Sequence, residues 1–481
     1  MRALIKIRPI VRAIPEDLTP LRALAAVERD PHTVFFESGG PAENGAQWTI
    51  LAFDPQWRLE VRAGVLRRIT ASEHLLIPGE PMAALARAWP ERIACEEGSI
   101  PFVSGLAGYI AYDLKDYLER YPRRARRESS LPDLSLGFYD VVWAWDRVSG
   151  RAWAVSTGLP ERDSKGRRDR AEARLTEQWA RVMTAEDRGH QATGAHANIA
   201  SNFTRDSYCR MVERALDHIA AGDIYQVNLA QRFRVEPSPD PASLFRSLRE
   251  ESPAPYSAFV STPAGAILSS SPERYFRIQG DRIETWPIKG TRPRGDSPEA
   301  DAALASALRE SAKDRAENVM IVDLERNDLG RICVIGSVRV TALCEVATYA
   351  NVHHLVSRIE GRLRPDAGPR DVIRALHPGG SITGAPKIRA VEIIDALEPT
   401  RRGVYTGGIG YWDASGDCDF NIAIRTIVVE SGSASFHVGG GIVADSTPEG
   451  EYEETLVKAG GMMRALGLPV SDPPISAAAS R

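Results

Sequence analysis

Strand-like and helical segments follow one another in mixed groups along this chain, and their order limits the fold more than any other feature. Residues from about 7 to 153 are rich in strand-like runs separated by turns, with one short helix expected over 81–89. Beyond residue 202, groups of strands alternate with helices expected over 204–221, 298–328, 369–376, 386–397 and 448–466. A strict alternation of strand and helix would predict a parallel sheet. The mixed groups instead predict an α+β fold with a large antiparallel β-sheet sandwich flanked by helices.

The sequence divides into regions at a polar stretch. The chain has 481 residues, 43% of them hydrophobic, which suffices for one large domain or two ordinary ones. A charged helix is expected over 159–181, and the small, polar residues 185–200 show no periodicity and predict a linker. We therefore expect a strand-rich N-terminal region over 1–200, a second region over 201–468 and a flexible tail over 469–481.

Charge and hydropathy disfavour several classes of protein. The 60 basic residues nearly balance the 64 acidic ones, and a formal net charge of -4 provides no field that would favour nucleic acid or an anionic membrane. No apolar stretch approaches the length of a membrane span, and the first residues lack the pattern of a secretory signal. These features predict a cytoplasmic protein that works on small molecules.

Residues 271–295 predict a β-hairpin whose open end would carry a carboxyl group and an amine. If Phe276 faces Trp286, the same register places Glu273 directly opposite Lys289. A register that differs by one residue would separate the two side chains diagonally, and the sequence leaves both registers open. Prolines and a glycine near the strand ends are typical of a ligand site. A surface ion pair on a turn is the alternative.

Two of the expected helices carry carboxylates on one face. Asp314 and Glu317 are three residues apart, as are Glu451 and Glu454, and Lys458 follows one turn beyond. Oxygen ligands from a few carboxylates suit Mg²⁺, which keeps one or two of them together with water and substrate oxygens. A solvated acidic face is the alternative for either helix alone.

A glycine-rich segment precedes the helix expected over 386–397. The segment spans residues 377–387 and includes Thr383 and Gly384. A proline follows at a position favoured in the first turn of a helix, and the backbone amides before it could bind a carboxylate or a phosphate. The segment does not match a Walker A loop, because its lysine follows proline instead of preceding Ser or Thr, and this disfavours ATP.

A second group of residues predicts a site for another carboxylate. The glycines at Gly439–Gly441 follow a strand and precede the last acidic helix. Tyr405 and Arg425 are expected on neighbouring strands between the two glycine-rich segments. A tyrosine hydroxyl, a guanidinium, glycine amides and the amine of Lys458 together favour a carboxylate. The expected substrate is therefore small, polyanionic and handled with Mg²⁺.

Two adjacent histidines, His353 and His354, open an expected strand. Consecutive side chains of a strand point to opposite faces, so one histidine could reach a site while the other is buried or solvated. Neither has a second metal ligand at helical spacing, and zinc is therefore not expected.

These motifs resemble the chorismate-utilising enzymes, a family that includes anthranilate, aminodeoxychorismate, isochorismate and salicylate synthases. The resemblance runs from about residue 202 to residue 466 in the family's order, and GLAGYIAYDL in the N-terminal region adds to it. The matching segments are SSSPER, PIKGTRPRG, ENVMIVDLERNDLGR, HHLVSRIEG, HPGGSITGAPKIRA, YTGGIGY, IAIRT and GGGIVADSTPEGEYEETLVKA. The resemblance implies the chorismate-utilising enzyme fold.

The resemblance also implies a role for each matched position. Mg²⁺ would bind the ring carboxylate of chorismate, and its ligands would be Glu317 and Glu454, supported by Asp314 and Glu451. Glu273 would act as the general acid for departure of the C4 hydroxyl, with His354 beside that departure. The substrate would contact Thr291, Thr383, Gly384, Tyr405, Arg425, Gly439, Gly440, Gly441 and Lys458.

Two positions separate the members of the family. Members that form isochorismate or salicylate have a water-activating lysine where this chain has Gln226, so attack by water is not expected. Anthranilate synthases usually read PIAGT where this chain reads PIKGT, and this lysine marks the aminodeoxychorismate synthases. The resemblance therefore implies that Lys289 attacks C2 of chorismate, and that ammonia then adds at C4 and expels the lysine, leaving 4-amino-4-deoxychorismate. An anthranilate synthase component I and a catalytically idle binding subunit are the alternatives.

The implied reaction requires uncommon protonation states and an external supply of ammonia. An amine attacks only when neutral and a carboxyl group donates only when protonated, so burial should draw the pKa values of Lys289 and Glu273 toward neutrality. A glutaminase of the common type needs a cysteine on a glycine-flanked turn, and none of the five cysteines has a neighbouring glycine. We therefore expect a separate glutamine amidotransferase subunit, and a product that enters 4-aminobenzoate and folate biosynthesis.

A short N-terminal segment suggests a regulatory ligand. The sequence Phe-Phe-Glu-Ser, which ends in Glu37 and Ser38, resembles an element that binds feedback tryptophan in related synthases. It predicts a tryptophan pocket in the N-terminal region.

Overall fold

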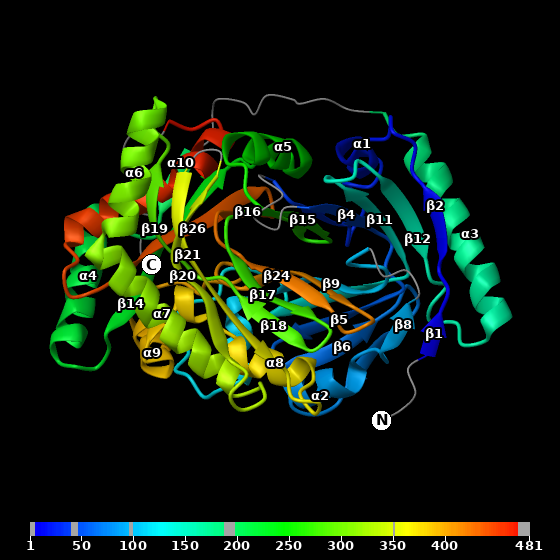
Figure 1. Cartoon of the computed structure of the whole chain (residues 1–481), viewed down its shortest axis with the longest axis horizontal. Coiled ribbons are helices and arrows are strands. Elements are labelled where there is room, and N and C mark those ends of the chain that lie inside the picture. The colour runs from blue at the N-terminus through cyan, green and yellow to red at the C-terminus, as the bar shows by residue number, and fades with distance from the viewer. Residues whose placement is uncertain (1–4, 40–46, 96–99, 187–197, 350–351, 470–481) are drawn as a thin grey trace.

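Two twelve-stranded antiparallel sheets, here called sheet 1 and sheet 2, face each other and carry helices on their outer sides (Figure 1). The computed structural model describes residues 5–39, 47–95, 100–186, 198–349 and 352–469. Every strand pairing within the two sheets is antiparallel, whereas a separate two-stranded sheet, β1 (Ile5–Ile7) with β8 (Ile93–Cys95), is parallel. The predicted α+β sandwich is therefore confirmed.

Strands from distant parts of the sequence lie side by side in both sheets. Sheet 1 has the order β19 (Ile288–Pro293), β21 (Val352–Arg362), β18 (Arg282–Thr285), β17 (Arg274–Gln279), β24 (Cys418–Ile422), β23 (Gly408–Asp413), β9 (Gly105–Ile110), β10 (Leu134–Tyr139), β5 (Trp57–Arg62), β6 (Val65–Ile69) and β7 (His74–Ile77), with β20 (Arg339–Thr348) paired to β21. Sheet 2 has the order β13 (Asn198–Ser201), β14 (Gln226–Glu236), β26 (Ser433–Ile442), β25 (Thr426–Glu430), β16 (Gly265–Ser271), β15 (Tyr256–Thr262), β3 (Val34–Glu37), β4 (Trp48–Ala52), β11 (Val141–Asp146), β12 (Ala152–Ser156) and β2 (Ile10–Ala13), with β22 (Gly384–Ala385) paired to β14.

Apolar side chains form a core between the sheets and a further core beneath each layer of helices. Tyr109 of sheet 1 and Ile267 of sheet 2 belong to the cluster between the sheets. The helices that pack on sheet 2 are α1 (Pro20–Ala25), α3 (Ser164–Met183), α4 (Arg205–Ala220), α5 (Pro241–Glu251), α9 (Lys387–Leu397) and α10 (Pro448–Ala465). Those that pack on sheet 1 are α2 (Pro81–Ala88), α6 (Pro298–Glu310), α7 (Ala312–Gly330) and α8 (Pro369–Leu376). Two short 3-10 helices, η2 (Tyr112–Tyr117) and η3 (Gly380–Ile382), complete the described elements.

Capping residues determine where several helices begin. Thr204 caps α4 and exchanges hydrogen bonds with Ser207 in a capping box, so this helix begins close to the start of the range predicted for it. The single helix predicted over 298–328 is wrong, because it is divided into α6 and α7 at Ser311. Ser311 has an extended backbone, and its hydroxyl accepts a hydrogen bond from the Asp314 amide at 3.3 Å, so a new helix starts there.

The sequence regions do not correspond to separate sheets. Each sheet contains strands from before and after residue 200, so the predicted boundary divides the sequence and not the sheets. Most of the predicted linker (residues 187–197) and nearly all of the predicted tail (residues 470–481) lie outside the described residues. The end of the predicted linker is strand β13, which pairs with β14.

The helices that carry the predicted acidic residues lie together. Figure 1 shows α7 and α10 on the same side of the molecule, at the opposite end from α3. Strands β19, β21 and β26 run between these two helices in the view. Within the described residues, no helix has the length and the apolar character that a membrane-spanning helix requires.

Candidate active site

Glu273 directly precedes β17 and Lys289 lies on β19, and these two segments of sheet 1 do not form one continuous hairpin. Ile278 of β17 pairs with Ile283 of β18. This register differs by one residue from the register that would pair Phe276 with Trp286, and the sequence left both registers open. The direct pairing of Glu273 with Lys289 is therefore wrong. Lys289 instead lies on β19, which leaves the hairpin and pairs with β21. The partner strand β21 fixes β19 in place, and this long-range pairing has no signal in the hairpin sequence.

The amine of Lys289 is held by the glycine-rich segment. Its Nζ donates a hydrogen bond to the Ser381 carbonyl of η3 at 3.0 Å, and the same carbonyl accepts a bond from Asn228 Nδ2 at 2.7 Å. Burial lowers the pKa of Lys289, while nearby carboxylates act in the opposite direction. These carboxylates belong to Glu317, Glu273 and Glu454. No sequence pattern indicates these roles of Ser381 and Asn228, because their contacts depend on the fold.

Glu273 is a buried acid beside this amine. Burial raises its pKa to about 7, and the nearby Ser381 hydroxyl, Lys289 and the Ile288 amide act in the opposite direction. The main chain is fixed at this point, since the Glu273 carbonyl accepts a hydrogen bond from the Ile422 amide at 3.0 Å. A carboxyl group with a pKa of about 7 can hold or release a proton near neutral pH, so Glu273 can act as an acid.

Two carboxylates of α10, those of Glu451 and Glu454, lie next to Gly440, and Glu317 of α7 is within electrostatic reach of Glu454. Burial is the main cause that raises the pKa of Glu317, and the charge of Glu454 adds to it, so the two side chains are within electrostatic reach. Glu451 Oε1 accepts a hydrogen bond from the Ser446 hydroxyl at 2.6 Å. Its Oε2 is buried and has no hydrogen-bond partner among the described residues. A Cβ atom added to Gly440 would lie 2.8 Å from this Oε2 and 3.2 Å from Glu454 Oε1.

The donor set fits one hard cation that is completed by other ligands. Within the described part of the chain, no group of three His, Cys, Asp or Glu side chains is arranged to hold a metal ion by itself. Mg²⁺ commonly uses one or two carboxylates and takes its remaining oxygens from water and substrate. The unpartnered Glu451 oxygen and the adjacent Glu454 oxygen fit this requirement. Asp314 is engaged elsewhere, in an ion pair of 2.9 Å with Arg292.

Lys458 and the predicted glycines lie against the same carboxylates. The Nζ of Lys458 donates to the Gly439 carbonyl at 2.9 Å and forms an ion pair with Glu454. The glycines were expected after a strand, but they lie within β26. A Cβ atom on Gly441 would lie 2.2 Å from Gln226 Nε2, so a larger residue there would force the Gln226 side chain to move.

Tyr405 and Arg425 were expected on neighbouring strands, and this expectation is wrong. Tyr405 precedes β23, and Arg425 lies in the break between β24 and β25 with a φ of 51°. Thr406 also has a positive φ, of 61°. Such left-handed conformations of residues other than glycine often occur at functional sites. Burial lowers the pKa of Arg425, while Tyr405 and Glu454 favour its charge and are therefore close to it.

Buried contacts hold the Tyr405 ring. The ring stacks on His437 with centroids 5.0 Å apart and planes inclined by 11°. Arg402 lies 5.7 Å from the ring centroid and pairs with Glu398 at 2.7 Å. These supporting residues come from a turn, a helix end and a strand, so sequence spacing gave no indication of them.

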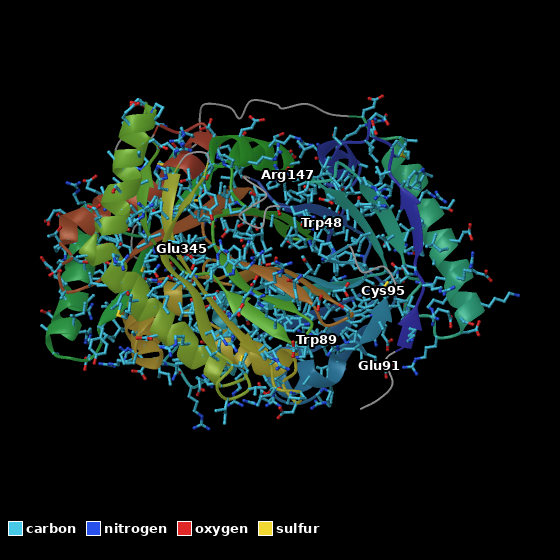
Figure 2. The ribbon with its side chains drawn as sticks, in the orientation of Figure 1. Trp48, Trp89, Glu91, Cys95, Arg147 and Glu345 are labelled. Carbon is cyan, nitrogen blue, oxygen red and sulfur yellow. The ribbon has the colours of Figure 1, made fainter. Side chains whose placement is uncertain are left out.

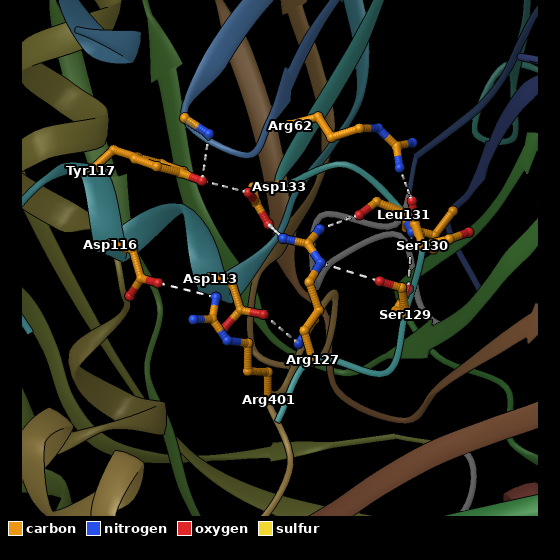
Figure 3. Close-up of polar contacts among 12 residues, drawn as sticks. Arg62, Asp113, Asp116, Tyr117, Arg127, Ser129, Ser130, Leu131, Asp133 and Arg401 are labelled. Carbon is orange, nitrogen blue, oxygen red and sulfur yellow. Dashed lines mark hydrogen bonds and ion pairs between the residues drawn. The ribbon is translucent and has the colours of Figure 1, made fainter. Parts of the chain in front are cut away.

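A network of polar side chains anchors the segment before Tyr405 (Figure 3). Asp113 accepts a hydrogen bond from the Gly403 amide at 3.2 Å, and Arg401 forms an ion pair with Asp116 at 3.1 Å. These contacts join the N-terminal region to the turn that carries Tyr405. Residues far outside the predicted site therefore hold one of its members.

The two histidines of β21 point to opposite faces, as predicted. His354 Nδ1 lies 3.0 Å from the Thr291 hydroxyl, and burial lowers the pKa of His354 to about 4. The imidazole is therefore neutral at neutral pH. His353 contacts Asp301 at 2.9 Å on the other side. Thr291 and His354 are thus a connected pair on neighbouring strands.

Thr383 and Gly384 shape the turn beneath the amine. Thr383 is fully buried, and its hydroxyl donates to the Gly379 carbonyl at 2.8 Å. Gly384 has a φ of 142°, and a Cβ atom there would lie 2.2 Å from the Gln226 carbonyl oxygen. Gln226 itself is buried, with its Oε1 unpartnered among the described residues.

Glu37 and Ser38 line a different cavity, which lies between the two sheets. Its volume is about 130 Å³, and its wall includes Trp48, labelled in Figure 2, and Tyr411. Glu37 forms two hydrogen bonds with the Arg249 guanidinium, of 2.7 and 2.8 Å. Glu37 and Ser38, the residues predicted to bind tryptophan, thus line a cavity, but this cavity is separate from the site that contains Lys289.

This fold and these motifs define the class of protein. The family described as chorismate binding enzyme matches residues 33–464, and the chain belongs to this family. The family resemblance noted in the sequence is therefore confirmed.

Individual relatives are divided between two activities. The chain is 37% identical to the aminodeoxychorismate synthase component 1 of Bacillus subtilis over 91% of this chain and 92% of the relative. It is also 37% identical to the anthranilate synthase component 1 of Thermus thermophilus over 96% of this chain and 98% of the relative. Its fold is similar to the crystal structure of anthranilate synthase component I from Streptococcus pneumoniae, with a TM-score of 0.78, 32% identity and coverage of 87% of this chain and 92% of that chain.

Proposed function

We propose that this enzyme converts chorismate and ammonia to 4-amino-4-deoxychorismate, as component I of an aminodeoxychorismate synthase. The family match and relatives with that name support this proposal. The observation that carries it is a partly buried Lys289 side chain whose amine, with its lowered pKa, is held by the Ser381 carbonyl beside Glu273 with its raised pKa. An anthranilate synthase would not need a nucleophilic amine at this position.

The reaction uses the amine and the acid in turn. The neutral Lys289 amine forms a bond to C2 of chorismate, the two ring double bonds shift, and the C4 hydroxyl leaves as water with the proton of Glu273. Ammonia then forms a bond to C4, the double bonds shift back, and the C2–N bond to Lys289 breaks. A proton from the incoming nitrogen returns to Glu273. The net change replaces one hydroxyl group by one amino group.

Other residues would bind and orient the substrate. Arg425, the Tyr405 hydroxyl and Lys458 supply donors for carboxylate groups. Bound Mg²⁺, held by Glu317 and Glu454 with support from Glu451, would neutralise the ring carboxylate and withdraw charge from the ring. Neutral His354 can donate or accept a hydrogen bond next to the departing hydroxyl, but it cannot repel the neighbouring cations.

The ammonia would come from a glutamine amidotransferase subunit. The names of the relatives contain "component 1", which supports the existence of a second component in those enzymes. In this proposal the complex works in the cytoplasm and supplies 4-aminobenzoate and folate biosynthesis.

Product identification tests the proposed function. The purified chain is incubated with chorismate, Mg²⁺ and ammonium salt at mildly alkaline pH, and the products are identified by mass spectrometry and fluorescence. We expect aminodeoxychorismate, which an added lyase converts to 4-aminobenzoate. Fluorescent anthranilate would assign the chain to the other activity of its relatives, and the absence of Mg²⁺-dependent turnover would favour a catalytically idle binding subunit.

A further inference from the structure

A second buried acid, Glu325, lies behind the segments that carry Glu273 and the acceptor of Lys289. Glu325 belongs to α7 and is only 7% exposed. A Cβ atom added to Gly380 of η3 would lie 3.6 Å from Glu325 Cγ, so this acid packs directly under the η3 turn. It is not among the residues that the proposed reaction uses.

The hydrogen bonds of Thr285 indicate which protonation state Glu325 has. The Thr285 hydroxyl lies 2.8 Å from the Tyr275 carbonyl oxygen and 2.8 Å from Glu325 Oε2. A hydroxyl group has one proton to donate, and a carbonyl oxygen can only accept. If Thr285 donates to Tyr275, the contact with Glu325 is a hydrogen bond only when the carboxyl group donates its own proton. Both contacts are therefore satisfied together only by a neutral Glu325.

The charges around Glu325 agree with a neutral acid. Asp328 of the same helix forms an ion pair with Lys387 at the start of α9, so the cation that acts on Glu325 is already paired with another carboxylate. Glu273 is a further acid within electrostatic reach, and the Tyr275 hydroxyl donates away from Glu325 to the Leu376 carbonyl at 2.8 Å. Burial, with the charges of Glu273 and Asp328, raises the pKa of Glu325 to about 8, against the effects of Thr285 and Lys387.

We propose that Glu325 is a positioning residue: as a neutral carboxylic acid, it donates to Thr285 and fixes strand β17 and turn η3 in the geometry that brings Glu273 to Lys289. Tyr275, whose carbonyl receives the Thr285 proton, is two residues from Glu273 and lies at a shift in the pairing of β17 with β24. Ser381, which holds the Lys289 amine, follows Gly380 in the turn above Glu325. The catalytic meaning of this geometry rests on the proposed function, whereas the protonation of Glu325 does not.

Ionisation of Glu325 would remove this support. An ionised carboxylate can only accept, so the single Thr285 proton would be claimed by two acceptors and one bond would be lost. The new negative charge would also make Glu273 harder to ionise. Ionisation of Glu325 would thus affect Glu273 through Thr285 and strand β17, and Lys289 through turn η3.

Infrared spectroscopy tests the protonation of Glu325 without any substrate. The difference spectrum between the wild-type chain and Glu325→Gln should contain the carbonyl band of a protonated carboxylic acid at neutral pH. The band should disappear as the pH rises through about 8. A carboxylate band in its place at neutral pH would overturn the proposal, whichever product the enzyme forms.

Kinetics with ammonium as the nitrogen source test the positioning role. Glu325→Leu removes the donor, and we expect kcat to fall on the order of tenfold, which corresponds to the loss of about one buried hydrogen bond. Glu325→Gln retains an N–H donor without charge, so it should restore most of this loss and leave the alkaline limb of the pH profile in place. A limb displaced to lower pH in Glu325→Gln would mean that a negative charge had been removed, and would refute a neutral Glu325.

A second pair of variants keeps the test decisive if Glu325→Leu does not fold. Thr285→Val removes the hydroxyl at nearly constant volume and should reproduce the fall in kcat, whereas Thr285→Ser should retain activity. Equal activity of the Val and Ser variants would show that the Thr285 bridge does not position the site.

Discussion

The Nζ of Lys289 donates to the main-chain carbonyl of Ser381 at 3.0 Å, and among the described residues no carboxylate oxygen forms an ion pair with this amine. A neutral acceptor stabilises the charged amine less than a carboxylate in direct contact does. Burial lowers the pKa of Lys289, and the three nearby carboxylates, which act in the opposite direction, do not outweigh it. The arrangement orients the amine while it keeps the neutral, nucleophilic form within reach.

Replacement of Lys289 tests its role as nucleophile. Lys289→Ala removes the amine, and we expect ammonia-dependent formation of aminodeoxychorismate to fall on the order of 10²-fold or more. Mass spectrometry of the wild-type chain mixed with chorismate alone should reveal a covalent adduct that the variant lacks. Lys165→Ala, at an exposed position of α3, is the matched control and should behave as wild type. Full activity of Lys289→Ala would remove the lysine from the mechanism.

The pKa of Glu273 predicts an alkaline limb in the pH profile. Glu273 must be protonated to release the C4 hydroxyl, so kcat/KM should decline as the pH rises through about 7. Glu273→Gln should lower kcat by about 10² to 10⁴-fold and abolish this limb. Glu299→Gln, at an exposed position of α6, should retain the wild-type profile.

The same raised pKa predicts a change in stability with pH. The folded protein binds the Glu273 proton more tightly than the unfolded chain, whose carboxyl has a pKa of about 4.5. Stability from this group is present below pH 4.5 and is lost as the pH rises to about 7. Glu273→Gln should therefore raise Tm relative to wild type above pH 7 but not below pH 4.5, as differential scanning calorimetry can measure. An equal effect at both pH values would contradict the assignment.

Local signals predicted the helices better than the site geometry. The helix expected over 369–376 is α8 with the same bounds, and Thr204 caps α4, because proline and capping residues act within one turn of the chain. The hairpin register was not predictable, since β21 draws β19 away from the hairpin. The turn at Arg425 was also missed, because its left-handed backbone depends on surrounding tertiary contacts.

In the candidate site as well, the sequence indicated several of the residues but not how they contact one another. Glu317, Glu454 and Lys289 were singled out from the sequence, and the structure brings their charges within reach of one another. Ser381 and Glu325 received no role, because their significance lies in contacts with residues about 40 to 90 positions away. Sequence patterns report which chemistry is present, while long-range packing decides which groups meet.

Removal of the acidic side chains should weaken Mg²⁺ binding. Glu317→Gln and Glu454→Gln each remove a charge from the proposed site, and we expect the Mg²⁺ concentration for half-maximal activity to rise on the order of tenfold or more. Mg²⁺ should also raise the Tm of the wild-type chain more than that of either variant, a measurement that needs no chorismate. Asp323→Asn, at an exposed position of α7, is the control and should respond as wild type.

The cavity between the sheets predicts a tryptophan site. Equilibrium dialysis with labelled tryptophan should show saturable uptake, and Glu37→Gln should weaken it because the Arg249 ion pair and one cavity wall both depend on this carboxylate. Glu236→Gln, at an exposed strand end, should bind as wild type. No uptake by the wild-type chain would end the hypothesis.

Gly440 provides the most specific steric test of the metal site. A Cβ atom there would lie 2.8 Å from Glu451 Oε2 and 3.2 Å from Glu454 Oε1, so Gly440→Ala should displace both oxygens without adding or removing charge. We expect the affinity for Mg²⁺, measured by calorimetric titration, to fall on the order of tenfold or more while the fold is retained. Gly330→Ala at the end of α7, where a Cβ atom would meet no atom within 4 Å, is the control and should bind Mg²⁺ as wild type. If Gly440→Ala also binds Mg²⁺ with unchanged affinity, the two glutamate oxygens beside this glycine are not metal ligands.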